Sequence, residues 1–305
     1  MRNTLCLNLV KISKKNDKMI FLTGDLGYKA LEPLQSAMKK KFINAGVSEQ
    51  NMISVSAGLA KENFSVWCYS IAPFIYARPF EQIRNDICFH NLPVKIVGNG
   101  GGYGYGVMGP THHAIEDYGV LLTLPKIKVY VPIFNSDLNA ITNILAKDKS
   151  PAYLRLGIDE SPKNFKTQKY KPWRKLISGN GPTVISIGSI SGTFIELFLS
   201  LEKKVRPNFW VVTELPLSEK QIPKSFIARL KLDKRLIIIE EHVKNGSFAN
   251  EFLSHLIQKK ISIDKYKHHF AINHIYSNYG SDKFMRKQSK LDDESIIKTI
   301  KKMCI

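Results

Sequence analysis

A loop crowded with glycine precedes two adjacent histidines. Residues 98–117 read GNGGGYGYGVMGPTHHAIED, and residues 104–109 within them match the pattern G-x-G-x-x-G. That pattern indicates a dinucleotide site when a strand ends directly before it and a carboxylate closes the next strand. Here the expected strand ends near Val97, Pro110 follows the last glycine, and the next strand ends in Pro132. The context therefore disfavours a nicotinamide cofactor.

The two histidines offer proton-transfer chemistry. Glycine allows positive φ and close backbone approach to a ligand, so the loop can deliver His112 and His113 to a substrate. Neighbours on a helix point about 100° apart, and no Cys or His partner stands at zinc-ligand spacing. We expect an imidazole that transfers a proton or donates to a substrate oxygen at the start of a helix. The alternative is a histidine that only caps this helix.

Two carboxylates also stand shortly after glycines. Glu49 lies in GVSEQNM, directly after the expected helix cap Ser48, and Asp25 lies in GDLG after the first expected strand. An acid at a helix start is stabilising there without any catalytic role. Asp25 has the similar alternative of an Asx turn that closes a strand.

The elements that must position these groups alternate between strand and helix. Short β-branched runs between segments of helical period are typical of parallel α/β units. Residues 161–180, rich in Lys, Pro and Gly, are expected to form a linker with Trp173 on a neighbouring surface. The fold class is thus α/β, with doubly wound domains over residues 1–160 and 181–305. The expected strands are 19–23, 66–69, 94–97, 128–131, 152–156, 183–187, 209–212, 235–240 and 269–272, and the expected helices are 48–61, 79–91, 114–124, 192–204, 247–260 and 292–302.

Composition limits the possible partners. The chain has 305 residues and a formal charge of +19, but its lysines are scattered without aromatic interleaving, so we expect solvated faces and no nucleic-acid site. No apolar run reaches the roughly 18 residues of a membrane span, and the basic residues follow the first apolar stretch, the wrong order for a signal peptide. We therefore expect a cytoplasmic protein without membrane contact. The four cysteines show no C-x-x-C spacing, so we expect no metal among them.

Several motifs in combination resemble one family. GVSEQNM, ARPFEQIRND at 77–86 and GPTHHAIED at 109–117 resemble the pyrimidine-binding domain of transketolase. ELPL at 214–217, IIIEEHVKNGSF at 237–248 and GSDKFMRKQSKLDDESI at 280–296 are similar to the C-terminal domain of that family. In this order they look like the separate C-terminal subunit of two-chain transketolases, and the resemblance covers nearly the whole chain.

The resemblance implies thiamine diphosphate as the cofactor, which performs its own organic chemistry. Glu49 matches the family glutamate that hydrogen-bonds the aminopyrimidine ring, and Gln50 stands beside it. Phe74 falls at a position that stacks on this ring, while Ile71 falls where transketolases often carry a further aromatic residue. Asp25 matches an aspartate near the thiazolium side of the cofactor.

The resemblance also implies substrate contacts and shows two departures. His112 matches a histidine that contacts sugar oxygens, with His113 next to it, and Arg155 in YLRLG matches an arginine that binds the substrate phosphate. Transketolases usually read D-G-P-T-H, but this chain has Met108 in place of the aspartate, and Gly100 replaces a second histidine. We therefore expect an atypical sugar, less hydroxylated or nucleotide-linked.

One expected motif is missing. The family binds the diphosphate and Mg²⁺ through G-D-G on another domain, and no G-D-G occurs here. We therefore expect a separately encoded N-terminal subunit that supplies most Mg²⁺ ligands, in a dimer of heterodimers that transfers a two-carbon ketol unit between sugars. The alternatives are the beta subunit of a 2-oxo-acid dehydrogenase, a deoxyxylulose-phosphate synthase, and a noncatalytic structural subunit.

Overall fold

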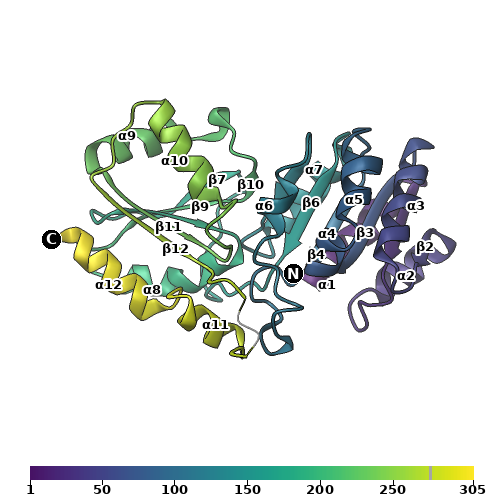
Figure 1. Ribbon diagram of the computed structural model, residues 1–305, viewed down its shortest axis with the longest axis horizontal. Coiled ribbons are helices and arrows are strands. Elements are labelled where there is room, and N and C mark those ends of the chain that lie inside the picture. The colour runs from purple at the N-terminus through teal and green to yellow at the C-terminus, as the bar shows by residue number, and fades with distance from the viewer. Residues whose placement is uncertain (275–276) are drawn as a thin grey trace.

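A seven-stranded sheet organises the first half of the chain (Figure 1). The computed structural model describes residues 1–274 and 277–305. The strand order is β10-β5-β6-β4-β3-β1-β2, in which β10 alone runs antiparallel to its neighbour. The strands are β1 (Met19–Thr23), β2 (Phe42–Asn44), β3 (Ser65–Ile71), β4 (Lys95–Asn99), β5 (Lys128–Tyr130), β6 (Ala152–Leu156) and β10 (Glu214–Leu215).

Helices cover both faces of this sheet because its central strands are apolar on both sides. Along β1, Ile20 packs with residues of α3, α4 and α6, whereas Phe21 packs with residues of α1, α2 and α7. The α-helices are α1 (Arg2–Ser13), α2 (Glu32–Met38), α3 (Glu49–Lys61), α4 (Ala72–Ala77), α5 (Phe80–Gln82), α6 (Asp117–Leu121) and α7 (Asp137–Lys147); short turns are η1 (Lys39–Lys41), the π-helical η2 (Ile83–Cys88) and η3 (Gly106–Met108).

A five-stranded sheet forms the second half, with the order β12-β11-β8-β9-β7. Helices α9 and α10 pack on one face, and α8, α11 and α12 pack on the other (Figure 1). The elements are β7 (Trp173–Ile177), β8 (Thr183–Ile187), η4 (Ser189–Thr193), α8 (Phe194–Ser200), β9 (Asn208–Val212), η5 (Glu219–Gln221), α9 (Lys224–Asp233), β11 (Arg235–Glu240), α10 (Phe248–Gln258), β12 (Lys265–Phe270), α11 (Asp282–Gln288) and α12 (Asp293–Cys304).

The two halves are joined by shared structure. Strand β10 follows β9 in the chain, yet it pairs with β5 and completes the first sheet. Arg174 of β7 donates two hydrogen bonds, of 2.7 and 2.6 Å, to the carboxylate of Asp137 at the start of α7. Both side chains are 1% exposed, so removal of either would leave an uncompensated buried charge. The halves therefore stabilise one another.

Most of the expected strands are confirmed, and the errors have local causes. Residues 173–177 form β7, with Trp173 packed against Phe226 and Phe248, so the expected linker is too long at its end. The last expected strand, 269–272, lies earlier in the chain, at β12 (Lys265–Phe270). The first residues of β12 were not predicted as strand because their mixture of basic and aromatic residues resembles that of a surface loop. Within the described ranges, no helix has the length and apolarity to cross a membrane.

Candidate active site

The carboxyl ends of parallel strands β1 and β3 bring the acidic candidate to one place. Gly24 follows β1, Ser70 lies near the end of β3, and Glu49 begins α3 after β2. A Cβ atom at Gly24 would lie 3.4 Å from both Glu49 Oε1 and Ser70 Oγ. The small residue after β1 therefore lets the other two side chains meet beside the backbone.

Glu49 is buried and has two partners. The residue is 3% exposed, and Ser70 Oγ donates to its Oε1 at 3.1 Å. Arg78 Nη1 donates to Oε2 at 2.8 Å. A buried carboxylate requires such partners, so this carboxylate is held in one orientation.

Phe74 and Arg78 form the next layer of the site. They stand four residues apart at α4 and its C-cap, a spacing that places side chains on one helical face. The guanidinium carbon of Arg78 lies 3.9 Å from the centre of the Phe74 ring. The ring of His112 lies edge-on to Phe74, with 5.1 Å between the ring centres. Glu49, Phe74 and His112, expected from sequence to act together, are therefore neighbours.

His112 lies in a turn and not at the start of a helix. The expected helix 114–124 is only α6 (Asp117–Leu121), because Gly102 and Ala114 exchange bridge hydrogen bonds that keep the preceding chain extended. His112 Nδ1 lies 3.0 Å from Thr111 Oγ1. The helix-cap alternative for His112 is therefore wrong.

Tyr105 occupies the space beside Gly100. A Cβ atom at Gly100 would come within 2.2 Å of the Tyr105 ring, and Gly100 has a φ of +76°. The Tyr105 hydroxyl accepts a hydrogen bond from Asn99 Nδ2 at 2.6 Å, and its ring centre lies 6.0 Å from that of His112. The ring of Tyr105 thus occupies the place where the resemblance predicts a histidine side chain.

His113 does not point into the site. It is 1% exposed, and its Nε2 lies 2.8 Å from the carbonyl oxygen of Gly106. Burial lowers the pKa of the His113 imidazole below its ordinary value, so the neutral ring donates this hydrogen bond through Nε2. The prediction that His113 binds substrate is replaced by a role in fixing the glycine loop.

Arg155 is also occupied by the protein itself. Its Nε lies 3.2 Å from Asp117 Oδ2, and its Nη2 donates to the carbonyl oxygens of Ala114 and Glu241, each at 2.9 Å. The residue is 6% exposed. The guanidinium thus joins the two halves of the chain through Nε and Nη2, and a phosphate contact by Arg155 stays a prediction.

Glycines of the loop pack closely against other parts of the protein. A Cβ atom at Gly101 would meet the Arg155 side chain at 2.2 Å, and one at Gly106 would meet the backbone nitrogen of Asp282 at 2.6 Å. The expectation that the loop also approaches a ligand stays a prediction. Without side chains, these glycines let the loop pack closely against α11 and β6.

The remaining candidates lie at the rim. Asp25 is exposed, and its carboxylate accepts a 2.7 Å hydrogen bond from Asn44 Nδ2. Gln50 is exposed on α3, Ile71 is half-buried at the N-cap of α4, and Met108 is 54% exposed in η3. The structure brings none of these four residues into hydrogen-bonding contact with Glu49.

Three residues of the candidate site could not be singled out from sequence. Arg78 lies in the motif at 77–86, but no pattern predicted its contacts with Glu49 and Phe74. Tyr105 was hidden among glycines, although a glycine that replaces a large residue is a signal that a neighbour fills its space. Asn44 links two loops through Asp25 and through a 2.9 Å hydrogen bond from the Gly46 backbone.

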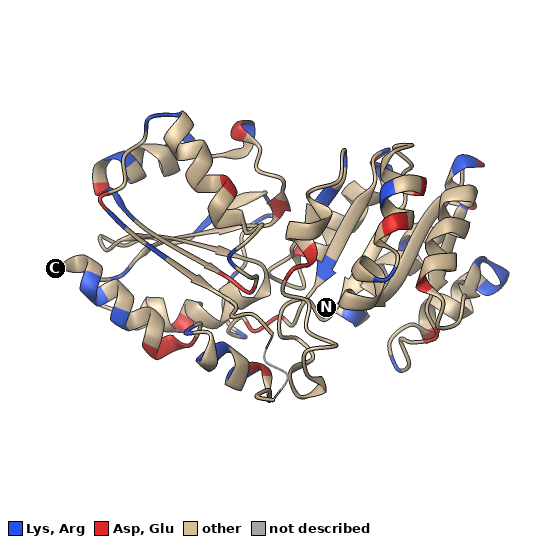
Figure 2. Ribbon diagram, viewed as in Figure 1, with Lys and Arg blue, Asp and Glu red and all other residues tan. Residues whose placement is uncertain are grey.

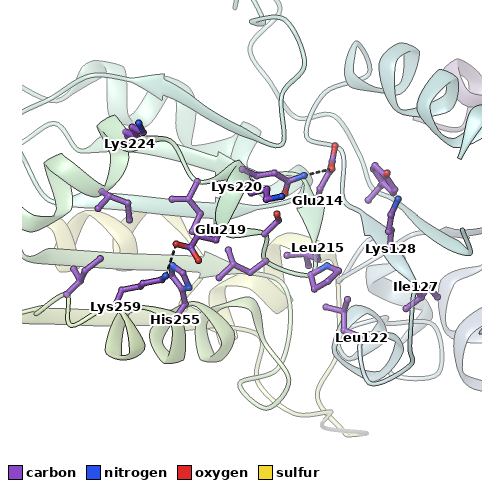
Figure 3. Close-up of a pocket in the computed structure, with 18 of the residues that line it drawn as sticks. Leu122, Ile127, Lys128, Glu214, Leu215, Glu219, Lys220, Lys224, His255 and Lys259 are labelled. Carbon is purple, nitrogen blue, oxygen red and sulfur yellow. Dashed lines mark hydrogen bonds and ion pairs between the residues drawn. The ribbon is translucent and has the colours of Figure 1, made fainter.

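A large cleft lies elsewhere, between the halves (Figure 3). Its volume is about 1580 Å³, and its lining includes Lys128 at the first residue of β5 and the ion pair of Lys259 with Glu219. Lys128 begins its strand, whereas the candidate site follows the ends of strands parallel to it. This cleft therefore lies at the amino ends of the parallel strands, and none of the candidate residues lines it.

The charge distribution adds no ligand preference. Figure 2 shows Lys and Arg spread over both halves of the chain. In the part of the chain that the structure describes, no three His, Cys, Asp or Glu side chains gather in a way that could hold a metal ion.

Comparisons with known proteins agree on one family. The model of the transketolase pyrimidine-binding domain matches residues 1–161. One of the subunits of an apulose-4-phosphate transketolase from Phocaeicola vulgatus is 25% identical over 92% of this chain and 93% of its own. A 1-deoxy-D-xylulose-5-phosphate synthase from Cytophaga hutchinsonii is 26% identical over 97% of this chain, which spans 47% of that protein. A split-gene transketolase solved as an inactive beta4 tetramer has a TM-score of 0.81 at 24% identity, and covers 99% of this chain and 97% of its own.

The buried ion pair of Arg155 with Asp117 predicts a loss of stability on substitution. Arg155→Leu should lower the free energy of unfolding by about 3 kcal/mol, because Asp117 would remain buried without its cation. Urea denaturation measures the change. A variant whose unfolding midpoint lay at the same urea concentration as that of the unmodified chain would show that this ion pair does not stabilise the fold.

Proposed function

Because this chain belongs to the family of transketolase pyrimidine-binding domains, we propose that it is the C-terminal subunit of a two-chain, thiamine diphosphate-dependent transketolase. The observation that carries the proposal is the group formed by Glu49, Phe74 and Arg78. It combines a buried carboxylate with an aromatic face at the carboxyl ends of parallel strands.

The residues fit an aminopyrimidine. A planar group with N–H donors already stacks on Phe74 at 3.9 Å and donates to Glu49 at 2.8 Å, in the form of the Arg78 guanidinium. An aminopyrimidine is also planar and also bears nitrogens that pair with a carboxyl group. When bound, thiamine diphosphate would supply the carbon nucleophile that accepts a two-carbon unit from a ketose.

This chain would contribute binding and proton positions. Glu49 would form a hydrogen bond with a nitrogen of the pyrimidine and would share a proton with it. Phe74 would stack on the ring and fix its plane. His112, edge-on to Phe74, would contact oxygens of the sugar. Asp25, held by Asn44, would lie toward the thiazolium side, with Gln50 and Ile71 at the rim.

Exposed apolar side chains support a partner at this face. Tyr28, Val47, Val107 and Met108 are 81%, 73%, 70% and 54% exposed, and each stands within five residues of Asp25, Glu49 or His112. Exposed apolar residues that form a patch mark interaction sites, and the closeness of these four to the candidate residues along the chain supports such a patch. The sequence also has no G-D-G motif for the diphosphate. The partner would be a separate N-terminal subunit that supplies the diphosphate and most Mg²⁺ contacts, in a dimer of heterodimers.

The proposed substrates are phosphorylated sugars that differ from the common pentose phosphates near one hydroxyl group. The relative from Phocaeicola vulgatus is named for apulose 4-phosphate, which supports a phosphorylated donor other than the common pentose phosphates. Met108 stands in the loop before His112 and cannot accept a hydrogen bond from a sugar hydroxyl as an aspartate would.

Glu49 provides the test of this function. In the pair formed with its partner, Glu49→Ala should lower kcat by about 10² to 10⁴, the range for loss of a proton-transfer group. Glu62→Ala, an exposed acid at the other end of α3, is the matched control and should retain full turnover. Steady-state transfer of a ketol unit between sugars measures both. Full activity of Glu49→Ala would favour a noncatalytic subunit.

Met108 provides the test of the substrate. Met108→Asp should raise kcat/KM for xylulose 5-phosphate by about tenfold, because a hydrogen bond to a charged group contributes about 1.5–3 kcal/mol. Leu232→Asp adds the same charge at an exposed apolar residue of α9, outside the candidate site, and should change little. An unmodified enzyme that already used xylulose 5-phosphate and ribose 5-phosphate as efficiently as an ordinary transketolase would contradict the atypical substrate.

A further inference from the structure

We propose that Arg78 occupies the place of the cofactor's pyrimidine ring and must leave it before the cofactor binds. Arg78 would then be a positioning residue that sets the affinity for the cofactor through Glu49 and Phe74. This inference rests on the proposed function, because it takes an aminopyrimidine as the ligand of those two side chains.

The geometry creates direct competition. The guanidinium lies against the Phe74 ring and, through Nη1, against Oε2 of Glu49, so it fills the space that joins the two side chains. A planar ring that stacked on this side of Phe74 and paired with Glu49 would need the same space and the same carboxylate oxygen. Both groups cannot be there at once.

Glu49 keeps a second contact when Arg78 leaves. Ser70 donates to Oε1, and Ser70 is fully buried on β3. Oε2 is therefore the oxygen that Arg78 releases, while Ser70 continues to hold the orientation of the carboxyl group. A neutral hydroxyl at Oε1 leaves the carboxyl free to share a proton with the incoming ring.

Arg78 is able to move. Its side chain is 43% exposed and stands at the C-cap of α4, the end of a short helix. Among the described residues, the hydrogen bond recorded for its guanidinium is the one to Glu49. The Arg78 end of the ion pair is 43% exposed and the Glu49 end 2% exposed, so water can hydrate the guanidinium once it moves, and the incoming ring becomes the new partner of the buried carboxylate. The closed arrangement is thus favourable and readily opened toward solvent.

A site that is mostly closed binds its ligand more weakly, in proportion to the open fraction. If Arg78 leaves the site open about one tenth of the time, the observed Kd is about tenfold above that of an always-open site. Removal of the cation should therefore tighten binding. A residue with a merely structural role would weaken binding or leave it unchanged when substituted.

The test compares Arg78→Met with Arg84→Met. Methionine keeps an unbranched side chain but cannot pair with Glu49, and Arg84 is an exposed arginine on the following turn. Calorimetric titration of thiamine diphosphate into the reconstituted pair should give a Kd about tenfold lower for Arg78→Met, about 1.4 kcal/mol, and an unmodified Kd for Arg84→Met. Equal or weaker binding by Arg78→Met would overturn the inference.

A second measurement needs no variant. The neutral pyrimidine half of the cofactor, 4-amino-5-hydroxymethyl-2-methylpyrimidine, is titrated into the reconstituted pair and followed by NMR. Salt at about 0.1 M shortens the screening length to about 10 Å from about 30 Å at 0.01 M, so it should loosen the pair of Arg78 with Glu49 and tighten binding of this uncharged probe. Binding independent of salt would overturn the inference.

The two hypotheses fail in different ways. An unmodified pair that bound no thiamine diphosphate would remove the proposed function, and the inference with it. An unmodified pair that bound the cofactor as tightly as Arg78→Met would remove only the role of Arg78.

Discussion

The burial of one carboxylate constrains the candidate site. Glu49 begins a helix beside the ends of β1 and β3, where it is shielded from water and must be satisfied by protein groups. Ser70 and Arg78 satisfy it, Gly24 gives it room, and Arg78 in turn covers Phe74. The parallel order of the strands makes this possible, because their carboxyl ends meet at one edge of the sheet. The burial of Glu49 thus accounts for the positions of Ser70, Arg78 and Phe74.

The glycine loop serves this site indirectly. Its glycines allow Tyr105, Arg155 and the start of α11 to approach the backbone, and His113 fastens the loop from below. His112 is thereby presented beside Phe74 without a helix to carry it. The arginine and the second histidine that looked like substrate ligands are the parts that hold the loop and the two halves together. His112 therefore owes its position to a loop that packs closely against the rest of the chain.

Local patterns predicted the sheets, and contacts across the fold decided the rest. The apolar runs around Ile20, Val66 and Ile96 predicted buried strands because both faces of the first sheet are covered. Motif resemblance identified Glu49, Phe74 and His112, and the structure makes them neighbours. Neither approach could place Arg78, since its partners are 29 residues away along the chain and one helical turn away. The same limit applies to Arg155, whose type suggested a phosphate and whose partner Asp117 is visible only once the chain is folded.

The central claim is that this chain holds the pyrimidine half of a cofactor site that is completed by another polypeptide. Titration calorimetry of thiamine diphosphate with Mg²⁺ tests it most directly when done on this chain alone, on its co-purifying partner alone and on their mixture. The account predicts tight binding by the mixture, with one cofactor for each pair of chains, and binding too weak to detect by either chain alone. Binding by this chain alone as tight as that of the mixture would contradict it.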